Sequence, residues 1–346
     1  MRLTKVFIIF SLLMILFACS KDETKIDNNS DSSGDGDTIK LRVAAMLPDD
    51  DPSTQDLEEF VEKVKEKTDG RIEMQVYPNN QLGDYSLMYK EIGSGSVDLG
   101  LISIPTQIDP RLVISNVPYL FQTYESAIDS YKPGSELVEI LSDIHLENNI
   151  QLLGFHPAGF GGIGTVKEIK DPLDFNTDTG LSIRVPEWPE HQKNAEILGF
   201  RTLSMPFEDI FTSMQTGQVD GWIGGHPESN FNLFNDTIKY YYDYRLYFET
   251  TQLLIGNDLW ERLSEEDRDI ITDAAEEMTN ESFSNIEDRS EQAFINMEES
   301  GINVIKFDDK EMEEMAELSK EQVWPLIKEE LGDELYERML EIADEK

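Results

Sequence analysis

The apolar and polar positions of residues 181–225 follow, in order, the periods of a strand, a helix, a strand, a helix and a strand. In the first strand three apolar residues alternate with Ser182 and Arg184, and Pro186 follows. Proline has no N–H to donate to a sheet, so the strand ends there. Arg184 is therefore predicted near the carboxyl end of a short strand, where open α/β sheets bind their ligands.

In the N-terminal third of the chain, segments with the period of a strand also alternate with segments that have the period of a helix. Alternating apolar positions predict strands at 39–47, 71–77 and 97–102, and apolar positions three and four apart predict helices at 52–70 and 84–92. This alternation of strand and helix is typical of a parallel sheet with helices on its faces.

The remainder of the chain is mostly helical in its pattern. A helix is predicted at 137–147 and a strand at 151–155. From about residue 264 the chain becomes strongly helical, with acidic residues in the first turn and few breakers up to about residue 300. Residues 306–345 add two amphipathic helices around Pro325.

One short pattern occurs twice. Residues 93–103 and residues 216–225 each follow a helix and contain a glycine turn, a Val-Asp pair and a strand. The two copies are far apart in the chain, whereas solenoid repeats recur within ~50 residues. We therefore expect one copy in each of two lobes, with Asp98 and Asp220 bonding backbone donors at the turn.

The first 38 residues are predicted to lie outside the folded part. Basic residues precede an apolar run that is too short to cross a bilayer, which takes ~20 residues, so 1–18 is predicted to be a signal peptide. The run ends in the lipobox Leu-Phe-Ala-Cys, which makes Cys19 the predicted lipidation site; a lone buried thiol is the alternative. Residues 19–38 have almost no apolar side chain and are predicted to be a disordered tether.

The length and the net charge of the chain limit the folds and the classes of function that are compatible with it. The remaining residues exceed one typical core, which predicts two lobes. The 70 acidic and 29 basic residues give a formal charge of −41, which would repel nucleic acid and would not attract anionic lipid. The single cysteine allows no disulfide within the chain. An anionic ligand would need a locally positive pocket, and this raises the importance of Arg184.

The sequence contains little evidence for dinucleotide binding, metal binding or catalysis. Residues 159–164 match G-x-G-x-x-G, but Pro172 leaves too little room for the helix that should bind a pyrophosphate. The four histidines are dispersed without metal spacing, and neither a Walker-type phosphate loop nor a G-x-S-x-G motif occurs. Carboxylate pairs are too abundant in so acidic a chain to indicate a glycosidase. We expect no catalysis, no metal and no tightly required cofactor.

The segments IRVP, LGF and SMPFEDIFTSMQTGQVDG occur in this order between residues 183 and 221. Together they resemble the signature region of TRAP transporter solute-binding proteins of the DctP type. The resemblance extends from about residue 39 to the C-terminus and includes GSVDLGLIS and LSEEDRDIITDAAEE. It implies an α/β fold like that of periplasmic binding proteins, with two α/β lobes around a ligand cleft and a long helix running across both lobes.

The resemblance also implies roles for individual residues. In the family, the arginine at the position of Arg184 anchors the ligand carboxylate, and Phe207 corresponds to an apolar wall. A guanidinium matches a carboxylate with two parallel hydrogen bonds, which a lysine cannot reproduce. From the residues alone, a structural ion pair is the alternative for Arg184. First-lobe contacts map to Met46, Tyr85 and Ser103.

Three family positions have changed in this chain. Gly161 stands where members often have a second arginine, Gly224 where they have an asparagine, and Glu187 where they have a small polar residue. The missing donors predict a ligand with one carboxylate rather than two, and Glu187 would favour an amine or several hydroxyls on it. The rest of the site is predicted to be aromatic and to consist of Trp188, Trp222, Phe160 and His226. For Trp222, a place in the lobe core is the alternative.

These observations predict lobe I at 39–160 plus 250–288 and lobe II at 161–249 plus 289–346. The protein would capture a small organic acid outside the cytoplasm, by cleft closure, and deliver it to the small and large subunits of an ion-gradient-driven TRAP permease. Its membrane contact would be the lipid anchor alone. Two alternatives stay open: a binding lipoprotein of an ATP-driven importer, and a secreted hydrolase with a carboxylate pair.

Overall fold

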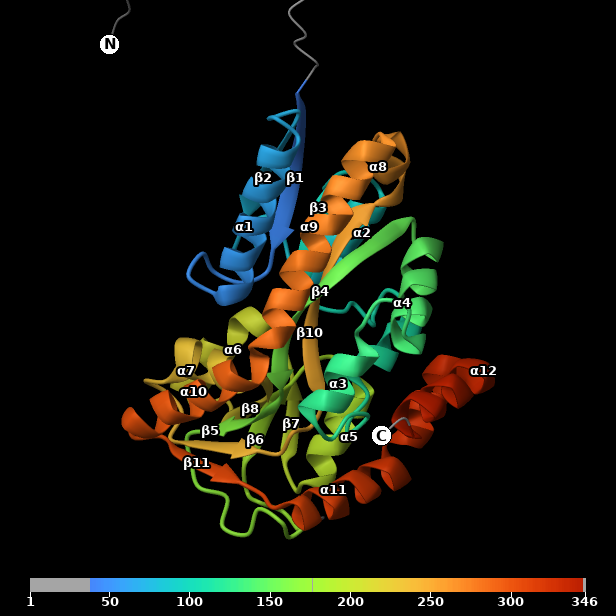
Figure 1. Ribbon diagram of the computed structural model, residues 1–346. Helices are drawn as coiled ribbons and strands as arrows, with labels where there is room; N and C mark the ends of the chain where they lie inside the picture. The colour runs from blue at the N-terminus through green and yellow to red at the C-terminus, as the bar shows by residue number, and fades with distance from the viewer. Residues whose placement is uncertain (1–37, 176, 345–346) are drawn as a thin grey trace, which may run out of the picture. The chain divides into compact units, whose positions relative to one another are not determined.

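The computed structural model describes residues 38–175 and 177–344, and these contain two separate β-sheets. The first sheet has the order β2 (Ile72–Tyr77), β1 (Ile39–Ala45), β3 (Leu99–Ile102), β10 (Phe248–Gly256) and β4 (Ile150–Phe160) (Figure 1). Strand β1 is parallel to β2 and β3, whereas β10 is antiparallel to β3 and β4. The parallel part is the βαβαβ unit that the sequence predicts.

The second sheet has six strands. Their order is β11 (Asn303–Lys306), β9 (Tyr240–Asp243), β5 (Gly162–Thr165), β8 (Gly221–Gly225), β6 (Ser182–Val185) and β7 (Arg201–Ser204). Strand β6 is parallel to both neighbours, and β5 is antiparallel to β8 and β9. Two sheets with flanking helices confirm the predicted two-lobe α/β class.

The helices around the first sheet bury apolar residues that lie three or four positions apart. They are α1 (Pro52–Lys67), α2 (Tyr85–Gly93), the 3₁₀ helix η1 (Pro110–Asn116), α3 (Tyr124–Ser130), α4 (Glu136–Glu147) and α8 (Asn257–Arg262). Helix α1 begins where the Asp51 side chain accepts the backbone N–H of Ser53, and it buries Leu57, Phe60 and Val64 against the sheet.

The second sheet carries the helices that lie nearest the predicted ligand motif. These are α5 (Pro189–Ile197), the 3₁₀ helix η2 (Phe207–Asp209), α6 (Ile210–Gln215) and α7 (Pro227–Phe234). Helix α5 starts with Pro189, which the first turn of a helix tolerates because its N–H would be unpaired there anyway. The helix therefore begins directly after the loop that leaves β6.

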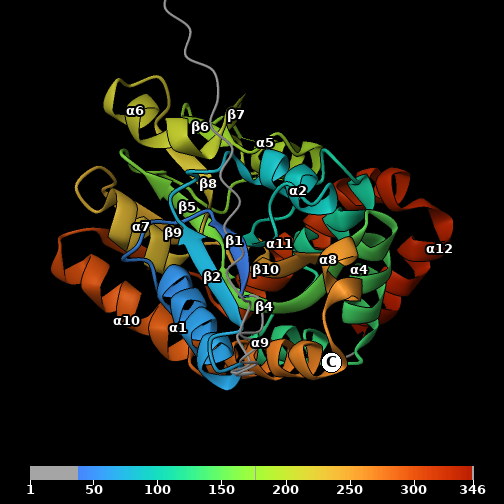
Figure 2. The ribbon, with the colours of Figure 1, turned by 90° about the horizontal axis from the view of Figure 1, so that it is seen from above.

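The predicted long helix is present as two consecutive segments. Helix α9 (Glu265–Ser284) packs on α1 and β4 of the first lobe, and α10 (Ile286–Glu299) packs on α7 and β11 of the second (Figures 1 and 2). Asn285 between them has φ −121° and ψ 6°, which is not helical. The helical run thus crosses both lobes, with one irregular residue where it passes from the first lobe to the second.

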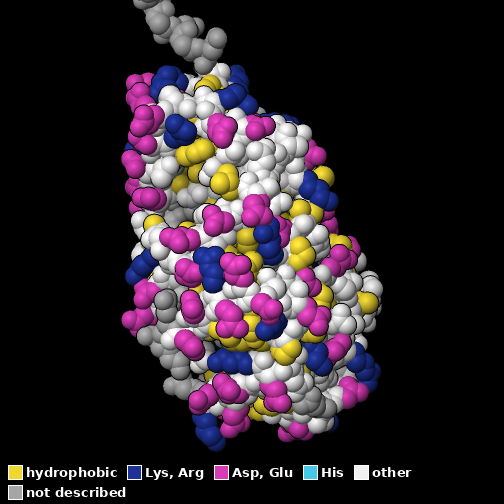
Figure 3. Space-filling model, turned by 90° about the vertical axis from the view of Figure 1, so that its right-hand side faces the viewer, with side chains coloured by type: hydrophobic (Ala, Val, Ile, Leu, Met, Phe, Trp, Pro, Cys, Tyr) yellow, Lys and Arg dark blue, Asp and Glu magenta, His cyan; other side chains and the backbone are white. Residues whose placement is uncertain are grey.

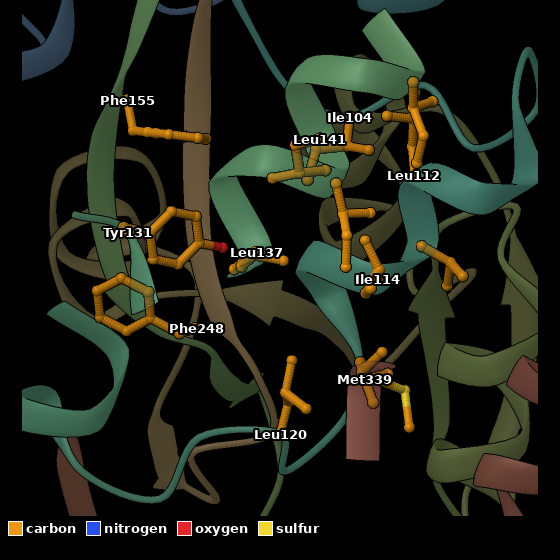
Figure 4. Packing of buried hydrophobic residues seen from close by; sticks show 14 of the residues in the cluster. Ile104, Leu112, Ile114, Leu120, Tyr131, Leu137, Leu141, Phe155, Phe248 and Met339 are labelled. Carbon is orange, nitrogen blue, oxygen red and sulfur yellow. The ribbon is translucent and has the colours of Figure 1, made fainter. Parts of the chain in front are cut away.

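The C-terminal helix corrects one expectation. We expected 289–346 to belong with lobe II, but α12 (Trp324–Asp344) buries its apolar face in the cluster around η1 and α4 of the first lobe. Figure 4 shows Met339 of this helix beside Leu120 and Ile114. The Trp324 indole N–H also donates to the Pro118 carbonyl over 2.9 Å. An amphipathic pattern fixes which face of α12 is buried, but not which lobe buries it. The preceding helix, α11 (Asp309–Gln322), leads to it.

The repeated Val-Asp pattern occupies equivalent places in the two sheets. Asp98 precedes β3 and accepts the backbone N–H of Arg42 in β1 over 2.7 Å. Asp220 precedes β8 and accepts the backbone N–H of Ser182 in β6 over 3.0 Å. Both aspartates therefore bond backbone donors, as predicted, but the donors belong to the neighbouring parallel strand instead of the turn itself.

Two predictions about the N-terminus fall outside the described residues, namely the signal peptide and the Cys19 lipobox with its tether. Among the helices that the structure does describe, none is both long and apolar enough to cross a bilayer. The G-x-G-x-x-G match at 159–164 lies at the end of β4 and in β5, and the next element in the described part of the chain is the strand β6. This agrees with its rejection as a dinucleotide site.

Candidate functional site

Arg184 is a buried guanidinium that has no acidic partner within the described part of the chain. It lies in β6 between β7 and β8, and only 6% of it is exposed. Its Nε donates to the Met205 carbonyl over 2.9 Å. None of the ion pairs among the described residues includes it. The alternative of a structural ion pair is therefore contradicted for the part of the chain described.

Burial lowers the pKa of Arg184 below its ordinary value, and nearby acidic groups only partly offset this. Those groups are Tyr247, Tyr85, Glu249 and Glu208, in order of decreasing effect. A desolvated cation with no bonded anion is costly for a folded protein. An anionic group that bonded the guanidinium would remove this cost.

Tyr85 shows that both lobes contribute to the surroundings of Arg184. It begins α2 of the first lobe, and its hydroxyl accepts a hydrogen bond from Gln107 over 3.3 Å. Burial raises the pKa of Tyr85, the charge of Arg184 lowers it, and the charge of Glu187 raises it again. The charges of Arg184 and of the exposed Glu187 therefore both act on Tyr85, and the ligand roles of these residues stay predictions.

Tyr247 fills the space at two of the changed family positions. A Cβ added to Gly161 would lie 3.1 Å from the Tyr247 Cζ atom. A Cβ added to Gly224 would lie 2.9 Å from the Tyr247 hydroxyl and 3.8 Å from an Arg184 terminal nitrogen. The Tyr247 side chain therefore occupies the space that the first side-chain atoms of an arginine at position 161 or an asparagine at position 224 would need. Sequence analysis missed this residue.

We expect Gly224→Ala to destabilise the protein by about 1–3 kcal/mol, because Gly224 has φ 114° and its new Cβ would meet the Tyr247 hydroxyl. Removing that hydroxyl in Gly224→Ala/Tyr247→Phe should recover part of the loss. Urea unfolding of the single and double variants measures this. Equal stability of Gly224→Ala and wild type would show that the contact with Tyr247 is unimportant.

Glu249 is the second residue of β10, and Tyr247 immediately precedes that strand. It is half-buried, and its Oε2 atom is buried without a hydrogen-bond partner among the described residues. Burial raises the pKa of Glu249 to about 8, while the Arg184 charge lowers it. The charge of Arg184 therefore acts on the pKa of Glu249, a residue that the sequence analysis did not identify.

An aromatic group extends from Tyr247. The His191 ring lies 4.4 Å from the Tyr247 ring and 4.9 Å from the Trp188 ring, both edge to face. The Trp188 Nε1 and both His191 ring nitrogens are buried without hydrogen-bond partners in the described part. Burial lowers the pKa of His191 to about 3, and the Arg184 charge contributes. At neutral pH His191 is thus an uncharged ring.

Trp222 and Phe207 lie together at the edge of a hydrophobic cluster. Trp222 is 1% exposed, packs on Phe234, and donates its indole N–H to Asn230 over 3.1 Å. Phe207 is half-buried, with its ring 6.0 Å from that of Trp222. For Trp222 this favours the alternative of a place in the lobe core. Phe207 keeps a partly exposed face.

The other predicted contacts are less directly connected to Arg184. His226 caps α7, and its ring nitrogens pair with the Ser229 backbone N–H and hydroxyl. Phe160 is 2% exposed and packs on Tyr124 and Phe248. Ser103 is buried at the end of β3, and Met46 packs at the edge of the first-lobe cluster. Among the described residues, no hydrogen bond or ion pair joins these four residues to Arg184, so their ligand roles remain predictions.

Glu190 gives a pH-dependent prediction. It is 3% exposed in the first turn of α5, its Oε1 has no partner among the described residues, and burial raises its pKa from 4.5 to about 7. The folded state therefore binds more protons than the unfolded state between these values, and stability falls as pH rises through them. We expect Glu190→Gln to stabilise the protein by roughly 1–3 kcal/mol at pH 8 and to change little at pH 4.5. Thermal unfolding at both pH values is the test, and equal effects at both would contradict it.

Within the described residues, no group of three or more His, Cys, Asp or Glu side chains is arranged to hold a metal ion. The charge of Arg184 interacts with Tyr247, Tyr85, Glu249 and Glu208, and it lowers the pKa of His191. These groups can orient a small polar molecule. The buried Arg184, which forms no ion pair among the described residues, favours an anionic group on that molecule.

Comparison with known proteins finds similar sequences and similar folds. Residues 43–329 match the family described as bacterial extracellular solute-binding protein, family 7, or DctP. A solute-binding protein of Chromohalobacter salexigens is 26% identical over 75% of this chain and 76% of its own length. The fold matches a TRAP periplasmic solute-binding protein from Desulfovibrio salexigens with bound orotic acid, with a TM-score of 0.80, 20% identity and coverage of 89% and 98% of the two chains. It also matches one from Chromohalobacter salexigens with bound D-glucuronate, with a TM-score of 0.79, 23% identity and coverage of 88% and 100%.

Proposed function

Because this chain belongs to family 7 of the bacterial extracellular solute-binding proteins, the DctP family, we propose that it captures a small organic acid for a TRAP transporter and does not act as an enzyme. The observation that carries the proposal is Arg184, a guanidinium that is 6% exposed and has no acidic partner within ion-pair distance among the described residues. A ligand carboxylate would supply the missing anion with two parallel hydrogen bonds.

The ligand is proposed to carry one carboxylate. Gly161 and Gly224 provide no polar side chain, and Tyr247 occupies the space beside both. A second carboxylate would therefore find no second guanidinium there. The proteins of similar fold from Desulfovibrio and Chromohalobacter hold orotic acid and D-glucuronate, each of which has a single carboxylate.

Capture is proposed to involve closure of the two lobes on the ligand. Arg184 belongs to the second lobe and Tyr85 to the first, and the charge of one already affects the pKa of the other. Closure over a ligand would exclude water from Arg184 and strengthen its pairing with a carboxylate. Phe207 would form an apolar wall, and Glu187 would face an amine or hydroxyl of the ligand.

The location and partners are proposed from the family and the sequence. Lipidation at Cys19 would attach the protein to the outside of a membrane, and TRAP permease subunits would receive the ligand. Figure 3 shows Asp and Glu side chains spread over the whole face in view, in keeping with the net charge of −41. Such a surface repels nucleic acid, so the ligand and the permease are the proposed partners.

Thermal unfolding against a panel of carboxylic acids tests the proposal. A ligand at 100 times its dissociation constant should stabilise the protein by ~2.7 kcal/mol. We expect stabilisation by at least one monocarboxylate, with the acid recovered unchanged after prolonged incubation. Conversion of the acid would indicate the hydrolase instead. Tight binding of succinate and malate, with no response to any monocarboxylate, would contradict the single-carboxylate proposal.

A further inference from the structure

Tyr247 is a buried tyrosine whose hydroxyl forms no hydrogen bond among the described residues, although the residue is only 3% exposed. Two other buried tyrosines of the same run do form such bonds. The Tyr244 hydroxyl donates to the Pro172 carbonyl over 2.9 Å, and the Tyr241 hydroxyl donates to the Gly225 carbonyl over 3.1 Å. Because buried tyrosine hydroxyls normally have a partner, the Tyr247 hydroxyl is available to a molecule outside the chain.

The Tyr247 hydroxyl and Arg184 border the same small space in front of Gly224. Apart from the adjacent residues of the chain, the three atoms nearest to a Cβ at this position are the Tyr247 hydroxyl at 2.9 Å, an Arg184 terminal nitrogen at 3.8 Å and the Trp222 Cζ3 atom at 3.9 Å. Arg184 uses its Nε for the Met205 carbonyl, and its terminal nitrogens form no hydrogen bond within the described part of the chain. Two donors therefore meet at one place beside an aromatic ring.

Gly161 and His191 hold the Tyr247 ring in position. The Gly161 backbone N–H donates to the Tyr247 carbonyl over 2.9 Å, and the ring passes so close to Gly161 that a Cβ there would lie 3.1 Å from the Tyr247 Cζ atom. The His191 ring packs on the Tyr247 ring edge to face, with 4.4 Å between the centroids. A side chain that is already ordered loses little conformational entropy when a ligand binds it. The hydroxyl is therefore preorganised for binding.

We propose that the Tyr247 hydroxyl donates a hydrogen bond to the same ligand carboxylate that Arg184 binds, which makes Tyr247 a further ligand-binding residue. This inference rests on the proposed function, because it requires that carboxylate. The two oxygens of a carboxylate offer about four acceptor positions, so the group can accept two bonds from a guanidinium and one from a phenol.

The tyrosine also defines how the ligand carboxylate is held. Burial raises the pKa of Tyr247 well above its ordinary value, so the hydroxyl keeps its proton and can donate at neutral pH. Arg184 supplies the positive charge, and Tyr247 adds a donor without a second charge. A second carboxylate beside the first would find no further cation in this space and would be costly to desolvate. The pair therefore suits a ligand with one anionic group at this end.

Titration calorimetry of the wild-type protein and of Tyr247→Phe tests the proposed bond. The probes are orotate, pyroglutamate, D-glucuronate and galactonate. We expect Tyr247→Phe to raise the dissociation constant of each acid that binds by about 10- to 100-fold, which is the effect of losing one hydrogen bond to a charged group.

Infrared spectroscopy shows which ligand group the hydroxyl contacts. Each acid that binds is labelled with ¹³C at its carboxylate, and the carboxylate stretching band of the bound acid is compared in the wild-type protein and in Tyr247→Phe. Since a hydrogen bond to a carboxylate oxygen changes this band, we expect its frequency to shift in Tyr247→Phe. An unshifted band would mean that the hydroxyl bonds another part of the ligand, and the inference would be wrong.

Tyr244→Phe is the matched control. It removes a buried hydroxyl that has a partner within the protein, the Pro172 carbonyl. We expect this variant to have a lower melting temperature and unchanged dissociation constants, because it leaves a carbonyl unpaired away from Arg184. Tyr247→Phe should show the opposite pattern, with an unchanged melting temperature in the absence of ligand and weaker binding.

The outcomes separate this inference from the proposed function. If the acids bind and need Arg184, but Tyr247→Phe leaves their affinity unchanged, the inference fails and the proposed function stands. A ligand-free melting temperature that falls as far in Tyr247→Phe as in Tyr244→Phe would also overturn the inference, since the hydroxyl would then have a structural role. If neither these acids nor the wider panel binds, or if binding is unchanged in Arg184→Ala, the proposed function fails and the inference with it.

Discussion

Arg184→Ala is expected to abolish ligand binding while leaving the protein folded. Truncating one partner of a buried, charged hydrogen-bonded pair costs about 2–5 kcal/mol, so the dissociation constant should rise at least about 30-fold. The fold should survive because Arg184 has no ion-pair partner among the described residues and donates only to the Met205 carbonyl there. Thermal unfolding with and without a bound carboxylic acid measures both effects.

Arg201→Ala is the matched control for that variant. Arg201 lies on the neighbouring strand β7, but it is exposed and pairs with Asp178 on the surface. Its loss should change neither the ligand response nor the stability by more than a few tenths of a kcal/mol. Arg184→Lys should still bind weakly, because an ammonium cannot form two parallel bonds. Unfolding of Arg184→Ala in the absence of ligand would instead assign Arg184 a structural role.

Trp222→Ala is expected to give the largest loss of stability in the second lobe. The side chain is 1% exposed between Phe207 and Phe234, and large-to-small changes at such aromatic positions cost about 3–5 kcal/mol. The substitution also leaves the Asn230 side-chain oxygen without its indole donor. Urea unfolding followed by circular dichroism should show the loss as a lower midpoint.

Trp222→Phe separates packing from the hydrogen bond. It keeps an aromatic ring in the cluster but removes the donor to Asn230, so we expect a loss of about 1–3 kcal/mol. Trp260→Ala, at the less buried edge of the first-lobe cluster, should cost less than Trp222→Ala. A stable Trp222→Ala protein that no longer binds the ligand would assign Trp222 to the ligand site instead of the core.

Local chemistry of the chain was enough to place several parts of the site. Proline after the alternating run ends β6, so Arg184 lies near the carboxyl end of a strand, as predicted. The Val-Asp pair comes directly before strand β3 in the first sheet and directly before β8 in the second. From that position the aspartate carboxylate can accept a backbone N–H of the neighbouring strand. These features depend on residues close together in sequence, and a reader of the sequence can recover them.

Other parts could not be read from local pattern. Helix α12 has an apolar face, but its choice of the first lobe depends on the shape that η1 and α4 present. Tyr247 belongs to an aromatic run that reads as ordinary core, and Glu249 is one acid among many. Only the two glycine substitutions taken together pointed to Tyr247. Gly161 and Gly224 stand where the family has two polar residues, and they leave space for one large side chain.

The sequence by itself determined the two-lobe class, the family and the arginine that the family resemblance points to, because periodicity and short motifs are properties of neighbouring residues. The tertiary structure alone decided that Gly161, Gly224 and Tyr247 meet, although they come from three distant segments. It also decided that the Glu249 Oε2 atom is buried without a hydrogen-bond partner among the described residues. Burial and charge at a site arise from which segments pack together, and a linear pattern does not specify that packing.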